Sequence, residues 1–166
     1  MSTKKSQDTI VNHLAQPDNE LIVWSHIYET GVELIDEQHK ELLNLTNHLY
    51  RACLDGDGHT MFREVMHQLV SYVKFHFSAE LKLLEKINYP GFHEHKKQHE
   101  ELAIDILEAV RNYDEHNKLL PNVFVRTLKD WVFSHIAVSD RLYAIYITDQ
   151  KKKGLLCDKQ IEDLLK

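Results

Sequence analysis

Apolar residues recur along most of the chain at intervals of three and four, the period of a helix that buries one face. The pattern is interrupted where glycine, proline and asparagine gather, at residues 55–58, 88–91 and 117–121. Between these breaks the sequence predicts four long helices, over residues 37–54, 61–87, 92–113 and 122–147. Because short connections favour antiparallel neighbours, we predict an all-α fold, an up-down-up-down four-helix bundle.

Each predicted helix contains an apolar stripe that would face the core of the bundle. From the first helix to the last, the stripes contain Leu42, Leu43, Thr46, Leu49, Cys53, Phe62, Val65, Leu69, Val73, Leu83, Leu84, Leu102, Ile106, Val110, Phe124, Leu128, Trp131, Leu142 and Ile145. The chain has 166 residues, which is enough for one domain with a sizeable core.

The segments that flank the predicted bundle differ in polarity. Residues 1–18 are polar and are expected to form a flexible N-terminal extension, whereas residues 19–36 are apolar enough to pack on the bundle as an arm. Residues 148–166 are expected to be a C-terminal tail in which residues 158–166 form a short helix. We therefore expect a single bundle domain over residues 19–147.

Composition excludes several classes of function. The net charge is −6 and Lys151-Lys152-Lys153 is the one markedly basic run, which argues against a nucleic-acid partner. The sequence has no run of about 18 apolar residues and no apolar block typical of a secretory signal. We therefore expect a cytoplasmic protein without a membrane partner. Cys53 and Cys157 fit no redox or haem-attachment motif.

Histidine is unusually frequent, with 12 in the chain, and some histidines interrupt the apolar stripes, where polar groups are costly to bury. The interrupting residues are His39, His76, Glu80, His95, His99 and His135. His76 and Glu80 are one helical turn apart, as are His95 and His99. Two side chains with this spacing can direct their nitrogen or oxygen atoms at one ion.

Asp140 is a further candidate, although it is five residues from His135 and so about 140° around an α-helix from it. It lies instead in line with Ile136, Tyr143 and Ile147, which form a second apolar stripe. We therefore expect the last helix to be buried over a wide face, with Asp140 pointing inward.

All seven candidate residues are predicted to lie at a similar depth along the axis of the bundle. A rise of 1.5 Å per residue places all of them within reach of one zone, roughly 10 Å below the end where the first and third helices begin. Nitrogen and carboxylate ligands gathered at one depth indicate a metal site. The other histidines show no such alignment and are expected to have ordinary roles: His13, His26, His48, His59, His67, His93 and His116.

With their surroundings, these residues resemble the hemerythrin family, in particular its single-domain bacterial members. The matching segments are Trp24, Gly31-Val32, Ile35 to Lys40, His76 to Glu80, Tyr89-Pro90, His95 to His99, Trp131, His135-Ile136 and Asp140. The resemblance extends over residues 19–147 and includes all seven positions at which the family places metal ligands.

The resemblance implies a non-haem di-iron centre, a cofactor of two iron ions. His95, His99 and His135 would bind one iron, and His39 and His76 would bind the other. The centre would therefore be asymmetric, with three imidazole nitrogens on one side and two on the other.

Two carboxylates, Glu80 and Asp140, and a solvent-derived oxo or hydroxo group would bridge the irons. The iron bound by His39 and His76 then keeps one open position, where the family holds O2 as hydroperoxide. The implied function is reversible O2 binding, for storage, delivery or sensing, by a monomer that is not an enzyme. NO, azide and other small anions are further candidate ligands, and the sequence leaves open whether the protein has a protein partner.

The sequence departs from its relatives around the implied O2 pocket. Val132 and Ala137 stand where larger aliphatic residues are common in the family. We expect a roomier pocket, with faster ligand exchange or faster autoxidation.

Three other functions stay open. A di-iron oxidase, peroxidase or ferritin-like protein would need carboxylate-rich ligands and paired Glu-x-x-His motifs, and one such motif occurs, Glu64-Val65-Met66-His67, far from the cluster. A sensor of O2, NO or redox state could act through a partner that contacts the lysine-rich tail, although no signalling domain is fused to the bundle. Nitrogen and oxygen ligands also do not exclude zinc, although bridging carboxylates suit a redox pair better.

Overall fold

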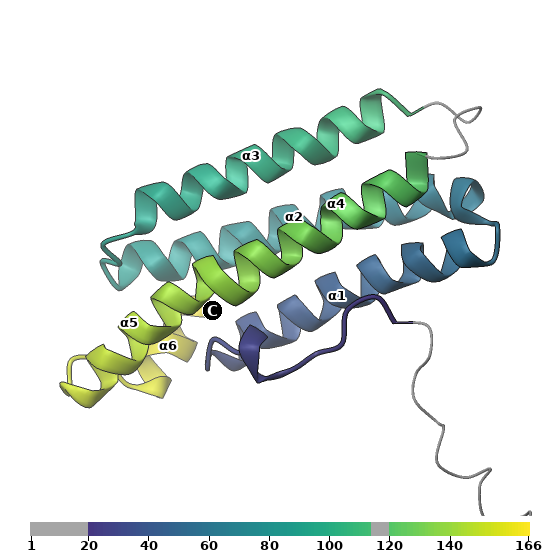
Figure 1. Ribbon diagram of the computed structural model, residues 1–166. Helices are drawn as coiled ribbons and strands as arrows, with labels where there is room; N and C mark the ends of the chain where they lie inside the picture. The colour runs from purple at the N-terminus through teal and green to yellow at the C-terminus, as the bar shows by residue number, and fades with distance from the viewer. Residues whose placement is uncertain (1–19, 114–119) are drawn as a thin grey trace, which may run out of the picture.

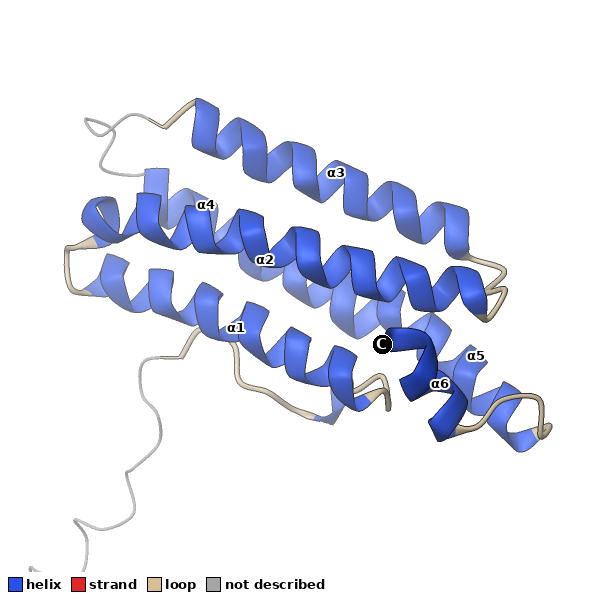
Figure 2. Ribbon diagram, turned by 180° about the vertical axis from the view of Figure 1, so that it is seen from behind, coloured by secondary structure: helices blue, strands red, loops and turns tan. Residues whose placement is uncertain are grey.

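The computed structural model describes residues 20–113 and 120–166, and all regular structure in these two ranges is helical (Figures 1 and 2). In chain order the elements are η1 (His26–Tyr28), α1 (Glu33–Leu54), α2 (Gly58–Lys86), α3 (Phe92–Arg111), α4 (Leu120–Ser134), η2 (His135–Asp140), α5 (Arg141–Lys152) and α6 (Asp158–Leu165). The predicted all-α class is confirmed. The extension predicted over residues 1–18 lies outside the described residues.

Four long rods lie side by side, and successive rods run in opposite directions (Figure 1). Helices α1, α2 and α3 begin and end within about one turn of the predicted boundaries, and the fourth rod consists of α4, η2 and α5 in one continuous line. The starts of α1 and α3 therefore share one end of the molecule with the ends of α2 and of the fourth rod.

The apolar stripes of the first three rods face inward as predicted, with Leu49 and Leu69 fully buried at the centre of the core. Val110 is an exception, because it is 43% exposed. Residues four apart on a helix drift by about 40°, so Val110 has turned well away from Leu102, eight residues earlier. Helix α3 packs mainly on α2, and its buried face is too narrow to include Val110.

The fourth rod is not a regular α-helix, because His135–Asp140 forms a π-helix turn. A π turn bonds each residue to the fifth along and so places residues five apart close to one another. Its one additional residue also rotates all later side chains by about 100° about the helix axis, relative to an uninterrupted α-helix. The turn thereby aligns His135 with Asp140, which regular α-helical geometry does not.

The π turn overturns two of the predicted core positions. Leu142 and Ile145 are 58% and 57% exposed, whereas Tyr143 and Ile147 are fully buried. The first stripe of the predicted helix ends at the π turn, and the second stripe, with Asp140, faces the core beyond it.

The arm before α1 packs on the bundle as predicted, with Ile22 and Tyr28 buried. Asn47 binds the backbone of Ile22: its Oδ1 accepts from the amide at 3.0 Å and its Nδ2 donates to the carbonyl at 2.7 Å. Further along the arm, Asp36 Oδ1 accepts hydrogen bonds from the amide and the hydroxyl of Thr30, both at 2.7 Å. These bonds fix the arm against α1.

The C-terminal segment forms the expected short helix, α6, which packs on α2 through the buried Ile161 (Figure 2). Helix α5 continues to Lys152, beyond the predicted end of the fourth helix at residue 147. No helix in the described part of the chain is long and apolar enough to cross a membrane.

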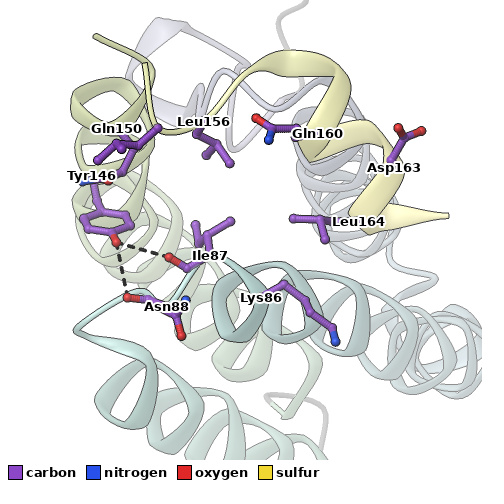
Figure 3. Close-up of a pocket in the computed structure, with 10 residues that line it drawn as sticks. Lys86, Ile87, Asn88, Tyr146, Gln150, Leu156, Gln160, Asp163 and Leu164 are labelled. Carbon is purple, nitrogen blue, oxygen red and sulfur yellow. Dashed lines mark hydrogen bonds between the residues drawn. The ribbon is translucent and has the colours of Figure 1, made fainter. Parts of the chain in front are cut away.

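A pocket of about 590 Å³ lies between α6, α5 and the end of α2 (Figure 3). Ile87, Leu156 and Leu164 surround its centre, and the Tyr146 hydroxyl donates to the carbonyl of Ile87 at 3.2 Å on one side. None of the seven candidate metal ligands lines this pocket. The pocket is therefore separate from the predicted metal site.

The register set by the π turn is tested by two identical substitutions on α5. We expect Ile147→Ala to lower the free energy of unfolding by about 2–4 kcal/mol, because it leaves a cavity in the core. Ile145→Ala should change it by less than about 0.5 kcal/mol, because Ile145 is exposed. Urea denaturation at matched metal content measures both, and a larger loss for Ile145→Ala would contradict the register.

Candidate metal centre

All seven predicted ligands converge near the end of the bundle where α1 and α3 begin. Helix α1 contributes His39, α2 contributes His76 and Glu80, α3 contributes His95 and His99, and η2 contributes His135 and Asp140. None of these side chains is more than 4% exposed. The other described histidines are partly or fully exposed: His26, His48, His59, His67 and His93.

One group of potential ligands consists of Glu80 and three histidines, His95, His99 and His135, whose ligand atoms all lie within 4.8 Å of one another. The Nε2 atoms of His95 and His99 each lie 3.0 Å from Glu80 Oε2. The Nε2 atoms of His99 and His135 are 2.8 Å apart. Three imidazole nitrogens and one carboxylate thus surround a common point.

A second group consists of His39, His76 and the same Glu80, again within 4.8 Å. His76 Nε2 lies 3.9 Å from Glu80 Oε2, and the rings of His39 and His76 meet edge to face with centroids 4.9 Å apart. Because Glu80 belongs to both groups, its carboxylate lies between two potential metal positions.

Asp140 also lies between the two groups. Its Oδ2 is 3.1 Å from His39 Nε2, and its Oδ1 is 3.2 Å from His135 Nε2 and 3.6 Å from His95 Nε2. One carboxylate oxygen therefore faces each group. This arrangement depends on the π turn, which places Asp140 beside His135.

Unpartnered atoms show that these residues fit a metal centre. Among the described residues, both oxygens of Asp140 and the Nε2 atoms of His39 and His76 are buried without a hydrogen bond. Such atoms are costly unless a cation binds them. Two ligands about 2.1 Å from one ion and at right angles lie about 3 Å apart, close to several of the distances above.

The protonation states of His76 and His135 suit metal binding. Burial lowers the pKa of His76 to about 3 and that of His135 well below its usual range, so both rings are neutral near pH 7. A neutral imidazole offers a lone pair to a metal, and binding then needs no loss of a proton from these rings.

The two carboxylates differ in their electrostatic surroundings. Burial, reinforced by the charge of Glu80, raises the pKa of Asp140 to about 7. Burial alone would also raise the pKa of Glu80, but hydrogen bonds from His95 and His99 lower it well below its usual range. Cations between the two carboxylates would stabilise the ionised form of both.

A layer of further residues orients the ligands, and sequence reasoning assigned these residues no role at the site. Gln38 Oε1 lies 3.0 Å from His76 Nδ1, which leaves His76 Nε2 directed at the cluster. The Tyr143 hydroxyl donates to Glu80 Oε1 at 2.5 Å. Both residues gave a signal in the sequence, because Gln38 lies one turn before Leu42 and Tyr143 lies on the second stripe of the fourth helix.

Aromatic rings cover the faces of two histidines. Phe77 stacks on His99 with centroids 3.6 Å apart and an interplanar angle of 5°, and Trp131 stacks on His135 at 4.5 Å and 14°. Stacking restricts rotation of each imidazole about its χ2 bond. It also excludes water from that side of the cluster.

Comparison with models of protein families matches residues 30–145 to the hemerythrin HHE cation binding domain. The chain belongs to the hemerythrin family. The matched range contains all seven converging side chains, and the resemblance inferred from the sequence is confirmed.

Curated hemerythrin relatives agree with this assignment. The bacteriohemerythrin of Pseudomonas aeruginosa is 34% identical over 122 residues, which cover 74% of this chain and 78% of the relative. That of Stenotrophomonas maltophilia is 31% identical over 136 residues, covering 81% and 84% of the two chains. That of Methylococcus capsulatus is 26% identical over 124 residues, covering 74% and 94%.

A solved structure also resembles the fold. It is a crystal structure described as a leucine-to-phenylalanine mutant, with a TM-score of 0.65 and 26% sequence identity. The match covers 75% of this chain and 95% of the solved chain.

The hydrogen bond from Gln38 gives a prediction about metal affinity. We expect Gln38→Leu to weaken metal binding roughly 10–100-fold, because His76 loses the partner that orients its ring. Gln68→Leu is the matched control, since Gln68 is exposed on α2 and should leave affinity unchanged. Competition with a chelator measures both, and equal affinities for the two variants would exclude an orienting role.

Proposed function

We propose that the protein binds O2 reversibly at a non-haem di-iron centre held by the seven converging residues. The observation that supports this most directly is the position of Glu80, whose carboxylate is shared by two groups of ligands. A site for a single ion would need only one such group of ligands. Family membership supports iron as the metal and O2 as the ligand.

In this proposal His95, His99 and His135 hold one iron, and His39 and His76 hold the other. The irons would supply the electrons that O2 accepts when it binds. The chain's own residues hold the two ions together, exclude water and keep the ligand set asymmetric. Because the His39 side has one nitrogen fewer, we place the O2 position there.

The surroundings of the ligands favour reversible binding over oxidative enzymatic chemistry. Five imidazole donors accompany two carboxylates, whereas ferritin-like oxidases depend on carboxylate-rich sites. Glu64 and His67, which form the chain's Glu-x-x-His motif, are exposed on α2 and take no part in the cluster. In the described part of the chain, therefore, no Glu-x-x-His pair contributes to the cluster.

Metal analysis and visible spectroscopy test the proposal. We expect about two irons per chain, and a visible absorption band that appears when O2 is added to the reduced protein and disappears when O2 is removed. His76→Ala should lose the band, because it removes one of two nitrogens beside the open position. His67→Ala is the matched control and should keep it, since His67 is exposed.

Two results would overturn the proposal. A protein that retains zinc and no iron when both are offered would point to a structural site. A His76→Ala variant with an unchanged band would show that O2 binds elsewhere.

Val132 and Ala137 lie on the fourth rod on either side of His135, and Val132 is buried in the core. We propose that they line the O2 pocket and that their small size leaves it roomy. The double variant Val132→Leu, Ala137→Ile should therefore release O2 and autoxidise several times more slowly. Stopped-flow measurement decides, and equal or faster rates in the variant would reject the assignment.

A further inference from the structure

The seven candidate ligands lie between two separate groups of buried apolar residues. The larger group is the main core of the bundle, around Leu49 and Leu69. The smaller group, which we call the end cluster, lies between the ligands and the nearer end of the bundle. The ligands therefore form a polar layer with apolar packing on both sides. The buried members of the end cluster are Val32, Ile35, Leu83, Leu84, Tyr143, Ile147 and Ile161.

The end cluster is thin along the axis of the bundle. Leu83 follows Glu80 by three residues on α2, and Tyr143 follows Asp140 by three residues on the fourth rod. Helix α2 ends at Lys86, so that only about 9 Å of helix lies between Glu80 and the end of the rod. The buried carboxylates therefore depend on a short stretch of apolar packing to keep water away from this end.

One member of the end cluster contacts a candidate ligand directly. Tyr143 is fully buried, and its hydroxyl donates to Glu80 Oε1 at 2.5 Å. Water that entered the end cluster would compete for this hydrogen bond, because a carboxylate oxygen accepts from water as readily as from a phenol. Exclusion of water from the end cluster therefore protects the carboxylate that both groups of ligands share.

Helix α6 covers the end cluster beside the end of α2 (Figure 2). Its Ile161 is 3% exposed and belongs to the cluster. On one side of Ile161 lies the pocket of about 590 Å³, where Leu164 and Ile87 face each other (Figure 3). On the other side, a hollow of about 550 Å³ is lined by Leu165 and Val32. Helix α6 is therefore held mainly through one fully packed side chain.

We propose that α6 is an end cap that keeps water out of the metal centre and so slows the loss of its ions. A carboxylate attracts a cation more strongly where water is excluded, because the local dielectric constant is lower. Helix α6 lies beyond residues 30–145, which match the family domain, so the cap is an addition to that domain. The inference rests on the proposed metal centre, but it depends neither on iron nor on O2.

Ile161→Asp tests the cap in the full-length, metal-loaded protein. The new carboxylate cannot stay buried without a partner, so α6 should leave the end cluster. We expect EDTA to remove metal from this variant at least about tenfold faster than from the wild type, the size of effect that follows when contacts around a metal site are lost. Leu155→Asp is the matched control: Leu155 is 67% exposed just before α6, and this variant should release metal at the wild-type rate.

Hydrogen exchange of the backbone amides shows whether the cap has left. In Ile161→Asp, the amides of α6 and of residues 83–87 should exchange faster, whereas those of residues 65–73, in the main core, should not. If the single substitution leaves α6 in place, the double variant Ile161→Asp, Leu164→Asp removes a second contact. A detached α6 with an unchanged rate of metal release would overturn the proposal.

A substitution in the main core separates capping from a general loss of stability. Leu69 is fully buried and lies about 16 Å before Glu80 along α2. Leu69→Ala should therefore lower the melting temperature without accelerating metal release. If Leu69→Ala accelerates release as much as Ile161→Asp at an equal loss of melting temperature, α6 only stabilises the fold and the proposal fails. Release of any bound ion reports on the cap, so a protein that binds metal but not O2 would contradict the proposed function alone.

Discussion

Two carboxylates, Glu80 and Asp140, lie wholly buried among five histidines, and the free energy of that burial constrains the rest of the structure. An ionised group removed from water costs several kcal/mol unless opposite charge compensates it. Cations would supply this compensation, because both oxygens of Asp140 are buried without a hydrogen bond and the nearest basic group is His39 Nε2, at 3.1 Å. Each of the four rods contributes at least one of the seven residues. A rod therefore cannot rotate or slide without separating a ligand from the others.

The residues that surround the cluster hold its side chains in position. Gln38 and Tyr143 bind a histidine and a carboxylate, while Phe77 and Trp131 cover two imidazole rings. These neighbours limit the rotamers of the ligands before any metal arrives. The asymmetry of the ligand set, with three histidines on one side of Glu80 and two on the other, is thus built into the packing of the bundle.

Helical spacing was sufficient to identify most of this site from the sequence. A polar residue on an apolar stripe is a strong signal, and six of the seven candidate ligands gave it. Asp140 was also expected to point into the cluster, but the expected cause, an α-helix buried over a wide face, was incomplete because it did not include the π turn. One additional residue in a single turn does not change the period of apolar residues on either side of it. The π turn was therefore visible only indirectly, in the five-residue spacing of His135 and Asp140 and in the two apolar stripes of the predicted fourth helix. For the same reason Leu142 and Ile145 were assigned to the core. Gln38 lay on the apolar stripe one turn before Leu42, but nothing in the sequence singled it out as the partner of His76.

The π turn has a consequence for anyone who wishes to move this centre into another scaffold. The ligand set cannot be copied onto four ideal helices of constant pitch, since no such helix aligns residues five apart. A transplanted site must include the whole six-residue segment from His135 to Asp140, and the recipient helix must then be rewritten beyond it, with its inner and outer positions offset by one residue. The irregular turn therefore shapes the candidate metal centre as directly as the histidines of the cluster do.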